Sequence, residues 1–271
     1  MSRLRRAGIG ALIGIAVTYV AAVAGMYVFQ RDLQYDRSGG VLALSDTALT
    51  GAEAVAIPTS DRAVINGWYQ KPASGQPLIV YFRGNARTFG REHPRFEAFV
   101  AAGYGFLAFD YRGFPASPGE VTEAHVLADG LAAFDWAAEQ GFPIVLWGRS
   151  LGTAPATWVA SQREAMALLL ESPFLSAVQV AAERYPVLPV RVLMHDQYRL
   201  SEWLRGVDEP VFVAHGTADT TIPVAHGEAV HRLAPNKDEL LIVANGSHSD
   251  LWDRGLWTAA QVFFSRADSG R

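Results

Sequence analysis

The chain has 271 residues, of which 50% are hydrophobic and 18% are charged, and its net charge is −4, so it can bury one large core. The weak negative charge comes without a basic stripe, and nucleic acid is therefore not an expected partner. The absence of cysteine excludes a thiol nucleophile, disulfides and thiolate metal sites, and no motif predicts a metal or cofactor.

The N-terminal segment predicts a membrane anchor. Arg3, Arg5 and Arg6 precede residues 7–29, which carry no charge and are long enough to span a bilayer core as a helix. The arginines predict a cytoplasmic N-terminus, with the rest of the chain on the periplasmic or lumenal side. A cleaved signal peptide is the alternative, because residues 22–24 resemble a cleavage site. The length of the apolar run favours an uncleaved anchor over residues 1–30.

The remainder, residues 31–271, is predicted to form one α/β domain. Residues 54–57 and 64–69 alternate enough to predict a hairpin at the edge of a sheet. Near-continuous apolar runs predict further strands, and helical stretches lie between them. These strands are expected at residues 78–82, 105–110, 144–147, 167–170, 211–214 and 240–244, and the helices at residues 93–102, 121–140, 153–161 and 224–233. The pattern predicts about eight strands in a mostly parallel sheet that is flanked by helices.

Gly148-Arg149-Ser150-Leu151-Gly152 joins an expected strand to an expected helix. A strand, a Gly-x-Ser-x-Gly turn and a helix form the setting of a nucleophile elbow. The turn strains the backbone of the serine, and glycine at both flanking positions avoids clashes that a Cβ would cause. The motif predicts that Ser150 is a nucleophile, provided that a base and an acid follow it in the chain.

The expected partners of Ser150 follow in the order acid, then base. Asp219 comes after the predicted strand 211–214, and His248 comes after the predicted strand 240–244. Both residues are therefore expected at the carboxyl edge of the sheet, where open α/β sheets place catalytic groups. Glu171, at the end of the apolar run 167–170, is the alternative acid.

Other histidines fit the role of base less well. His226 and His231 fall inside a helical stretch and are expected at the surface. His215 ends a strand, where a structural hydrogen bond is the plainer interpretation. The strand-and-loop context of Asp219 and His248 therefore makes them the predicted acid and base.

Residues 173–209 interrupt the alternation of strands and helices. They contain prolines, aromatic residues and many aliphatic residues, and no strand is expected there. An insertion between strands of such a sheet is expected to form a small cap that supplies apolar surface for an acyl chain. A helix packed as ordinary core is the alternative.

Taken together, these motifs resemble the α/β-hydrolase superfamily. The resemblance rests on the Gly-x-Ser-x-Gly turn, on His215-Gly216-Thr217-Ala218-Asp219 and on Gly246-Ser247-His248. Residues 29–35, 82–86 and 110–114 are also similar to segments of its single-pass, membrane-anchored branch, which includes protein depalmitoylases and monoacylglycerol and lysophospholipid lipases. The resemblance extends from about residue 27 onward and leaves the substrate open.

The resemblance implies an oxyanion hole formed by the backbone N–H groups of Asn85 and Leu151. Arg83 stands where the family usually has histidine. It would favour an anionic group on the substrate, or it would pair with a nearby carboxylate and take no part in binding. Both interpretations remain open from the sequence.

We therefore expect a membrane-anchored serine hydrolase of carboxylic esters or thioesters, acting on a small or lipid-like acylated substrate without a cofactor. Ser150 would attack the carbonyl, His248 would carry the proton and Asp219 would orient the imidazole. A serine peptidase on the same fold and a catalytically silent membrane-anchored binding protein are the alternatives.

Overall fold

The computed structural model describes residues 3–269, and its centre is one eight-stranded sheet in the order β1-β2-β4-β3-β5-β6-β7-β8. Antiparallel pairing joins β1 to β2 and β2 to β4, and every other neighbouring pair is parallel. The strands are β1 (Glu53–Pro58), β2 (Val64–Gln70), β3 (Leu78–Phe82), β4 (Gly105–Phe109), β5 (Ile144–Arg149), β6 (Ala167–Glu171), β7 (Val211–Gly216) and β8 (Lys237–Val243). The predicted α/β fold with a mostly parallel sheet and an edge hairpin is confirmed.

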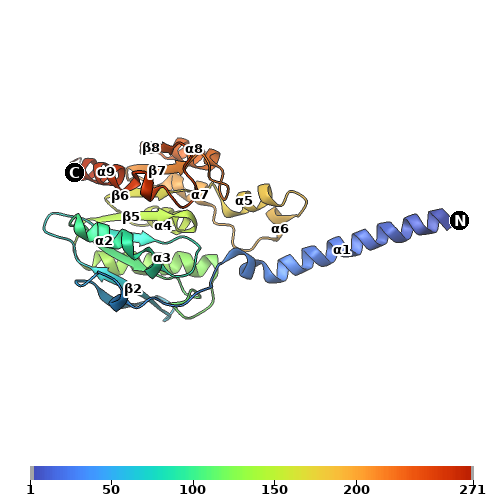
Figure 1. Cartoon of the computed structure of the whole chain (residues 1–271), viewed down its shortest axis with the longest axis horizontal. Helices are drawn as coiled ribbons and strands as arrows, with labels where there is room; N and C mark the ends of the chain where they lie inside the picture. Colours follow the sequence, from blue (N-terminus) through green and yellow to red (C-terminus); the bar gives the residue numbers. More distant parts are fainter. Residues whose placement is uncertain (1–2, 270–271) are drawn as a thin grey trace.

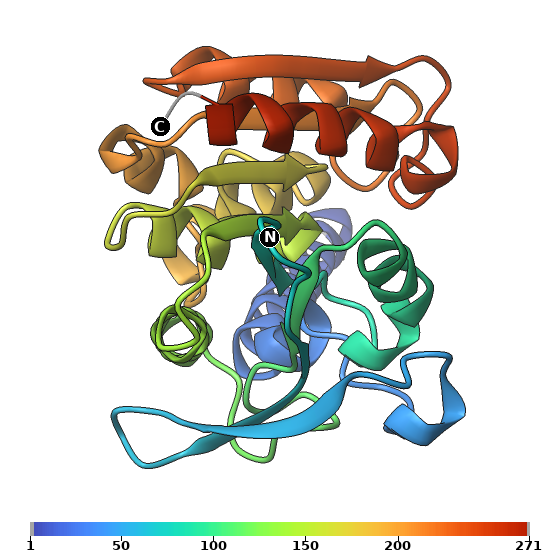
Figure 2. The same cartoon turned by 90° about the vertical axis from the view of Figure 1, so that its left-hand side faces the viewer.

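Helices cover both faces of the sheet (Figure 2). They are α2 (His93–Ala101), α3 (Glu123–Ala138), α4 (Thr153–Ala160), α8 (Val224–Leu233) and α9 (Leu256–Ser269). Side chains of α3, α4 and α8 pack in one core cluster, and those of α2 and α9 pack in the other. Successive side chains of β3 belong to opposite clusters: Val80 lies in the first and Tyr81 in the second. The chain also contains short 3₁₀ turns at η1 (Leu44–Asp46), η2 (Phe89–Glu92), η3 (Ser150–Gly152), η4 (Leu204–Gly206) and η5 (Trp252–Arg254).

The C-terminal helix α9 was not predicted. Leu256, Ala260, Phe263 and Phe264 are buried along one face of it. Their spacing of four, three and one residues is that of an amphipathic helix, so the signal was present in the sequence.

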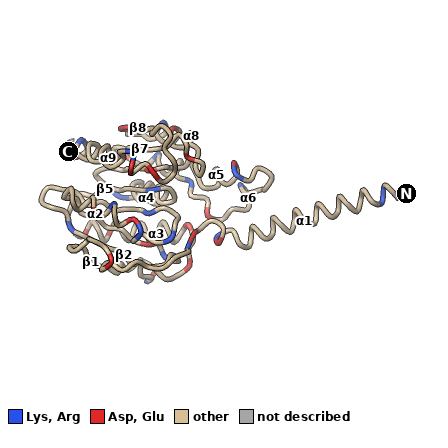
Figure 3. Tube along the Cα trace, viewed as in Figure 1, with Lys and Arg blue, Asp and Glu red and all other residues tan. Residues whose placement is uncertain are grey.

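Helix α1 (Arg3–Gln34) projects away from the body of the protein (Figure 1). Within the described residues it is the one helix long and apolar enough to cross a membrane, and none of its most apolar stretch is buried. Figure 3 shows the middle of α1 without acidic or basic residues, which gather at its two ends. The helix continues beyond residue 30, where the sequence analysis ended the anchor.

The interval between β6 and β7, residues 173–209, lies beside the C-terminal half of α1; we refer to it as the insertion (Figure 1). It carries three short helices: α5 (Ala177–Arg184), α6 (Val190–Leu193) and α7 (Leu200–Trp203). As the sequence predicted, no described residue of this interval forms a strand. Buried hydroxyl groups of Tyr35 and Tyr198 meet at 2.8 Å, which ties the end of α1 to the insertion.

Candidate active site

Ser150 occupies a sharp turn between β5 and α4. Its φ of 51° lies in the left-handed region, which is strained for a residue with a Cβ. A Cβ on Gly152 would lie 2.0 Å from the Phe82 carbonyl oxygen, and one on Gly148 would lie 2.6 Å from the Gly152 oxygen. Both glycines are therefore required by close backbone approach, and the turn holds the Ser150 side chain at the carboxyl end of β5.

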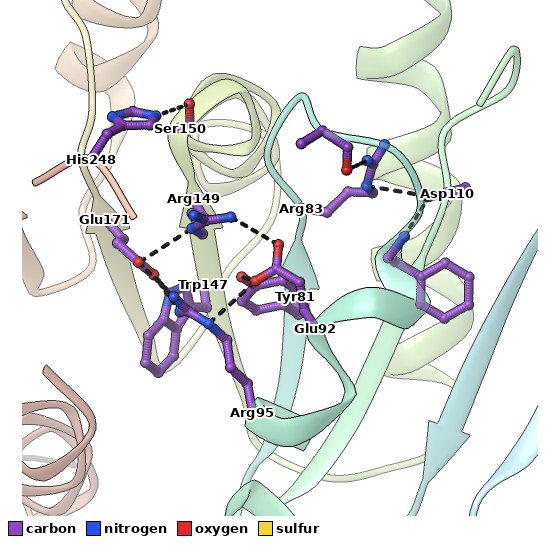
Figure 4. Close-up of polar contacts among 12 residues, drawn as sticks. Tyr81, Arg83, Glu92, Arg95, Asp110, Trp147, Arg149, Ser150, Glu171 and His248 are labelled. Carbon is purple, nitrogen blue, oxygen red and sulfur yellow. Dashed lines mark hydrogen bonds and ion pairs between the residues drawn. The ribbon is translucent and has the colours of Figure 1, made fainter. Parts of the chain in front are cut away.

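Three loops bring Ser150, His248 and Asp219 together. The His248 Nε2 atom lies 2.8 Å from the Ser150 Oγ atom, a contact drawn in Figure 4, and its Nδ1 atom lies 2.7 Å from Asp219 Oδ2. The three residues follow β5, β8 and β7, whose carboxyl ends meet at one edge of the parallel sheet. The structure thus brings these three side chains into one hydrogen-bonded chain.

The Asp219 carboxylate is held by several donors. The N–H groups of Thr221 and Ile222 each donate to Oδ1 at 2.8 Å. Burial raises the pKa of this carboxyl, but hydrogen bonds from His215, His248 and the Ile222 N–H outweigh burial and hold the pKa well below its usual range. An ionised Asp219 accepts the Nδ1 proton of His248, which leaves Nε2 free to accept the proton of Ser150.

Two further histidines support this loop region from inside the fold. His215 is fully buried, and its Nε2 atom lies 2.9 Å from the Ile222 carbonyl oxygen and 3.2 Å from Asp219. It therefore has the structural role that the sequence suggested. The expectation that His226 lies at the surface was wrong: only 3% of it is exposed, and its Nε2 atom lies 3.0 Å from Glu183.

Glu171, the alternative acid, accepts hydrogen bonds from Arg95 and Trp147. Arg95 donates to its two carboxylate oxygens at 2.6 and 2.9 Å, and the Trp147 indole donates at 3.1 Å. Burial raises the pKa of Glu171, but the charges of Arg95 and Arg149 more than offset this and lower it overall. Since its oxygens are engaged below the elbow, Glu171 is not the carboxylate that meets His248 (Figure 4).

Glu171 belongs to a buried ionic cluster that sequence analysis missed. Arg149, the residue before Ser150, pairs with Glu92 at 3.0 Å and with Glu171 at 3.4 Å. Arg95 bridges the same two carboxylates, and Tyr81 donates to Glu92 at 2.6 Å. The cluster fastens the elbow to η2 and α2. Its sequence signal was a glutamate at the end of an otherwise apolar strand, which requires a buried cationic partner.

The structure places Arg83 away from the nucleophile. The side chain is 1% exposed, pairs with Asp110 at 3.2 Å and lies over the Phe114 ring at 4.4 Å. It is absent from the lining of the cavity that contains Ser150. This geometry corresponds to the interpretation in which Arg83 pairs with a nearby carboxylate. Asp110 also accepts hydrogen bonds from Thr88 and from the Phe89 N–H, so this ion pair fixes the loop after β3.

A largely apolar cavity of about 470 Å³ opens at Ser150. This volume is within the range of small-molecule sites in proteins. Asn85 and Leu151 line the cavity beside the nucleophile, where an oxyanion would form. The remaining walls come from the insertion, from the loop after β7 and from α1 itself, a contribution of the N-terminal helix that the sequence did not reveal.

The end of α1 also holds the loop that carries Asn85. The Asn85 side-chain amide donates to the Gln34 carbonyl oxygen at 2.7 Å and accepts from the Asp36 N–H at 3.2 Å. The Arg87 N–H donates to the Asp36 carbonyl oxygen at 3.1 Å. Residues 34–36 therefore position the loop whose N–H group is expected to meet the oxyanion.

Among residues 3–269, no group of three or more histidine, aspartate or glutamate side chains is arranged to hold a metal ion. Ser150, which belongs to the hydrogen-bonded chain with His248 and Asp219, lines the cavity together with a few other polar side chains such as Gln30, Asn85 and Thr221. Such an arrangement suits nucleophilic attack by a hydroxyl group that is activated by an imidazole.

Comparisons with known proteins agree with this geometry. The family model described as "Hydrolase_4: Serine aminopeptidase, S33" matches residues 74–204. The uncharacterized protein Rv2307c of Mycobacterium tuberculosis is 34% identical over 245 residues, which cover 86% of each chain. The lysophosphatidylserine lipase ABHD12 of Danio rerio is 30% identical over 196 residues, 64% of this chain, and the chain spans only about half of that protein.

A solved structure shares the fold. The esterase Pf2001 of Pyrococcus furiosus superimposes with a TM-score of 0.68 at 20% identity, over 86% of this chain and 95% of that one. With the sheet topology, the elbow and these relatives taken together, the chain belongs to the α/β-hydrolase superfamily.

Proposed function

We propose that the protein is a membrane-anchored serine hydrolase that cleaves carboxylic ester or thioester bonds in lipid-like acylated substrates. The observation that carries the proposal is the continuous hydrogen-bonded chain from Ser150 through His248 to Asp219, which opens into an apolar cavity. The similarity to ABHD12, a lysophosphatidylserine lipase, supports a lipid ester as the class of substrate.

In this mechanism the Ser150 oxygen attacks the acyl carbonyl carbon while His248 Nε2 takes the hydroxyl proton. Asp219 stabilises the resulting imidazolium through Nδ1. The backbone N–H groups of Asn85 and Leu151 donate to the oxyanion. His248 then gives its proton to the departing alcohol or thiol, and water, activated by the same imidazole, hydrolyses the acyl-enzyme and restores Ser150.

Residues 1–30 would anchor the enzyme, with a cytoplasmic N-terminus and the hydrolase domain, residues 31–271, on the opposite side of the membrane. The arginines before the apolar stretch support this orientation. Contacts of α1 support an uncleaved anchor, since cleavage near residue 24 would remove the Tyr19 hydroxyl that donates to the Val187 carbonyl oxygen at 2.9 Å. The insertion would be the small cap.

A serine peptidase is the second candidate, because the matching family model is described as a serine aminopeptidase. The apolar character of the cavity favours an acyl chain over a peptide. Along most of its length the cavity presents aliphatic and aromatic side chains, and Arg184 is the single charged residue in its lining.

The test uses the full chain in detergent with p-nitrophenyl esters from acetate to palmitate and a fluorophosphonate probe. Wild-type protein and the exposed-serine control Ser45→Ala should hydrolyse the esters and become labelled. Ser150→Ala should lose both properties. Labelling that persists in Ser150→Ala would show that another residue is the nucleophile.

A further inference from the structure

One face of α1 forms a wall of the cavity that contains Ser150. Val23, Met26, Tyr27, Gln30 and Leu33 line the cavity from this helix. Their spacing of three, one, three and three residues places them along one side of a helix. The helix that we propose as the membrane anchor is therefore also part of the site, and the opposite wall is formed by α5 and α6 of the insertion (Figure 1).

A second hollow borders α1 farther from Ser150. A second cavity of about 420 Å³ lies between the helix and α6, and Val23, Tyr27 and Leu193 line both cavities. Leu33 lines the first cavity and Tyr19 lines the second, so the two cavities together border α1 over about 21 Å at 1.5 Å per residue. We refer to this pair of cavities as the groove. One leaflet of a bilayer core is about 15 Å thick, so the groove is long enough for the acyl chain of a membrane lipid.

The tip of the insertion, residues 185–194, reaches far along the apolar part of α1. It contacts Tyr19, which lies ten residues before Phe29, the last residue of the apolar stretch 7–29. That separation is about 15 Å along the helix axis. If α1 spans the membrane, the tip therefore lies at the depth of the hydrocarbon core.

The surface of the tip suits such a position. Val187 and Val192 are 76% and 82% exposed, and Val192 also borders the second cavity. Arg191 is the one charged residue of the tip, and its long stem allows the guanidinium to reach the headgroups. An isolated exposed valine is ordinary, but two on one short segment beside an unburied apolar helix form a continuous lipid-facing surface.

Polar side chains of α1 satisfy backbone groups of the insertion, Tyr19 at this depth and Gln30 at the end of the apolar stretch. The Tyr19 hydroxyl donates to the Val187 carbonyl oxygen, and the Gln30 amide donates to the Leu193 carbonyl oxygen at 3.3 Å and accepts from the His195 N–H at 2.7 Å. Irregular backbone is tolerated inside a bilayer only where the protein supplies such partners.

We propose that the tip of the insertion is embedded in the leaflet next to the hydrolase domain, and that the groove between α1 and the insertion takes the acyl chain of a lipid ester directly from that leaflet. The ester carbonyl reaches Ser150 at one end of the groove while the tail stays along α1 among apolar groups. This inference rests on the proposed function, since it names the entry path and the acyl site of the same reaction.

The acyl site is tested by filling the groove. Full-length Val23→Trp is compared with Val28→Trp, a matched change at a position that is 69% exposed and outside both cavities. The proteins are reconstituted in phosphatidylcholine vesicles and assayed with p-nitrophenyl palmitate and p-nitrophenyl butyrate. We expect Val23→Trp to lower the palmitate-to-butyrate ratio of kcat/KM about tenfold, as small changes in apolar pockets do. Val28→Trp should leave the ratio unchanged.

The position of the tip is tested with a fluorophore, because the chain has no cysteine to interfere. Val187→Cys is labelled with an environment-sensitive dye, and Val64→Cys, on the distant strand β2 and 42% exposed, is the control. Lipids with a quencher on the acyl chain should quench the dye at position 187 and not at position 64. Equal quenching at the two positions would overturn the embedded tip.

The outcomes separate this inference from the proposed function. If the wild-type protein shows no Ser150-dependent hydrolysis of either ester, both fall together. If hydrolysis depends on Ser150 but Val23→Trp and Val28→Trp have the same ratio, the acyl site along α1 is wrong and the hydrolase remains. Fluorophosphonate labelling of Val23→Trp checks that the site is formed, and Val23→Phe replaces it if labelling is lost.

Discussion

Asp219→Asn and Glu171→Gln are isosteric changes that should harm the protein in different ways. Asp219 accepts from His248 Nδ1 at 2.7 Å, so an amide there presents a donor to a donor and favours the wrong tautomer of the imidazole. The equivalent change in a serine hydrolase that has a Ser-His-Asp triad lowers kcat about 10⁴-fold. We expect a loss of that size here, which corresponds to about 5.4 kcal/mol of activation free energy.

Glu171→Gln should reduce stability instead. It removes the negative charge between Arg95 and Arg149, both of which are largely buried, and leaves the Gln amide facing the Arg95 guanidinium. Breaking a buried ion pair costs about 3–5 kcal/mol. For a domain of this size that cost lowers Tm by roughly 6–20 °C. The folded variant should keep a kcat orders of magnitude above that of Asp219→Asn, since Glu171 does not contact His248.

Both variants are measured with p-nitrophenyl butyrate at 25 °C, and their melting is followed in the same detergent. The two effects are separable because the melting curve reports the folded fraction independently of catalysis. The reasoning would be refuted if Glu171→Gln lowered kcat as far as Asp219→Asn while still folded. It would also be refuted if Asp219→Asn retained more than about a tenth of the wild-type kcat.

Three further predictions follow from the same geometry. Gly152→Ala should yield little folded protein, because its Cβ would meet the Phe82 carbonyl oxygen at 2.0 Å; a normal melting curve would contradict this. Since Asp219 has a pKa below its unfolded value of about 3.9, its stabilisation is present above that pH and is lost as pH falls through the folded pKa. The difference in unfolding free energy between wild type and Asp219→Asn should therefore shrink below about pH 4 in urea titrations, and a constant difference from pH 7 to pH 3 would oppose it. Arg83→Gln should lower Tm, because it removes the cation that pairs with Asp110, and it should not change the preference between neutral and anionic esters. A selective loss of activity on anionic esters would show that Arg83 takes part in substrate binding.

Local patterns in the sequence were sufficient for the strands and the elbow. A Gly-x-Ser-x-Gly motif between an apolar run and a helix predicts a nucleophile elbow. In that turn the backbone approaches both glycines so closely that a Cβ would clash. Near-continuous apolar runs predicted a parallel sheet because strands covered on both faces have no polar side. Helix α9, which was not predicted, has an equally clear helical period in Leu256, Ala260 and Phe263.

Long-range pairings were beyond the sequence. Asp219 and Glu171 both follow apolar strands, and only the packed structure shows that Arg95 engages one and His248 meets the other. Arg83 likewise had two interpretations until Asp110 was placed beside it. A charge pattern along the chain does not tell which oppositely charged group is nearest in space.

By itself the sequence determined the fold, the elbow at Ser150 and the apolar length of the N-terminal helix, because each depends on the spacing of residues that are neighbours along the chain. The tertiary structure alone decided that α1 lines the cavity and holds Asn85 through residues 34–36. The contacts between α1 and the insertion join residues more than 160 positions apart, such as Tyr19 and Val187. No local period or motif predicts a contact between residues so far apart in the chain. The contact forms only when the folded sheet places the insertion beside α1.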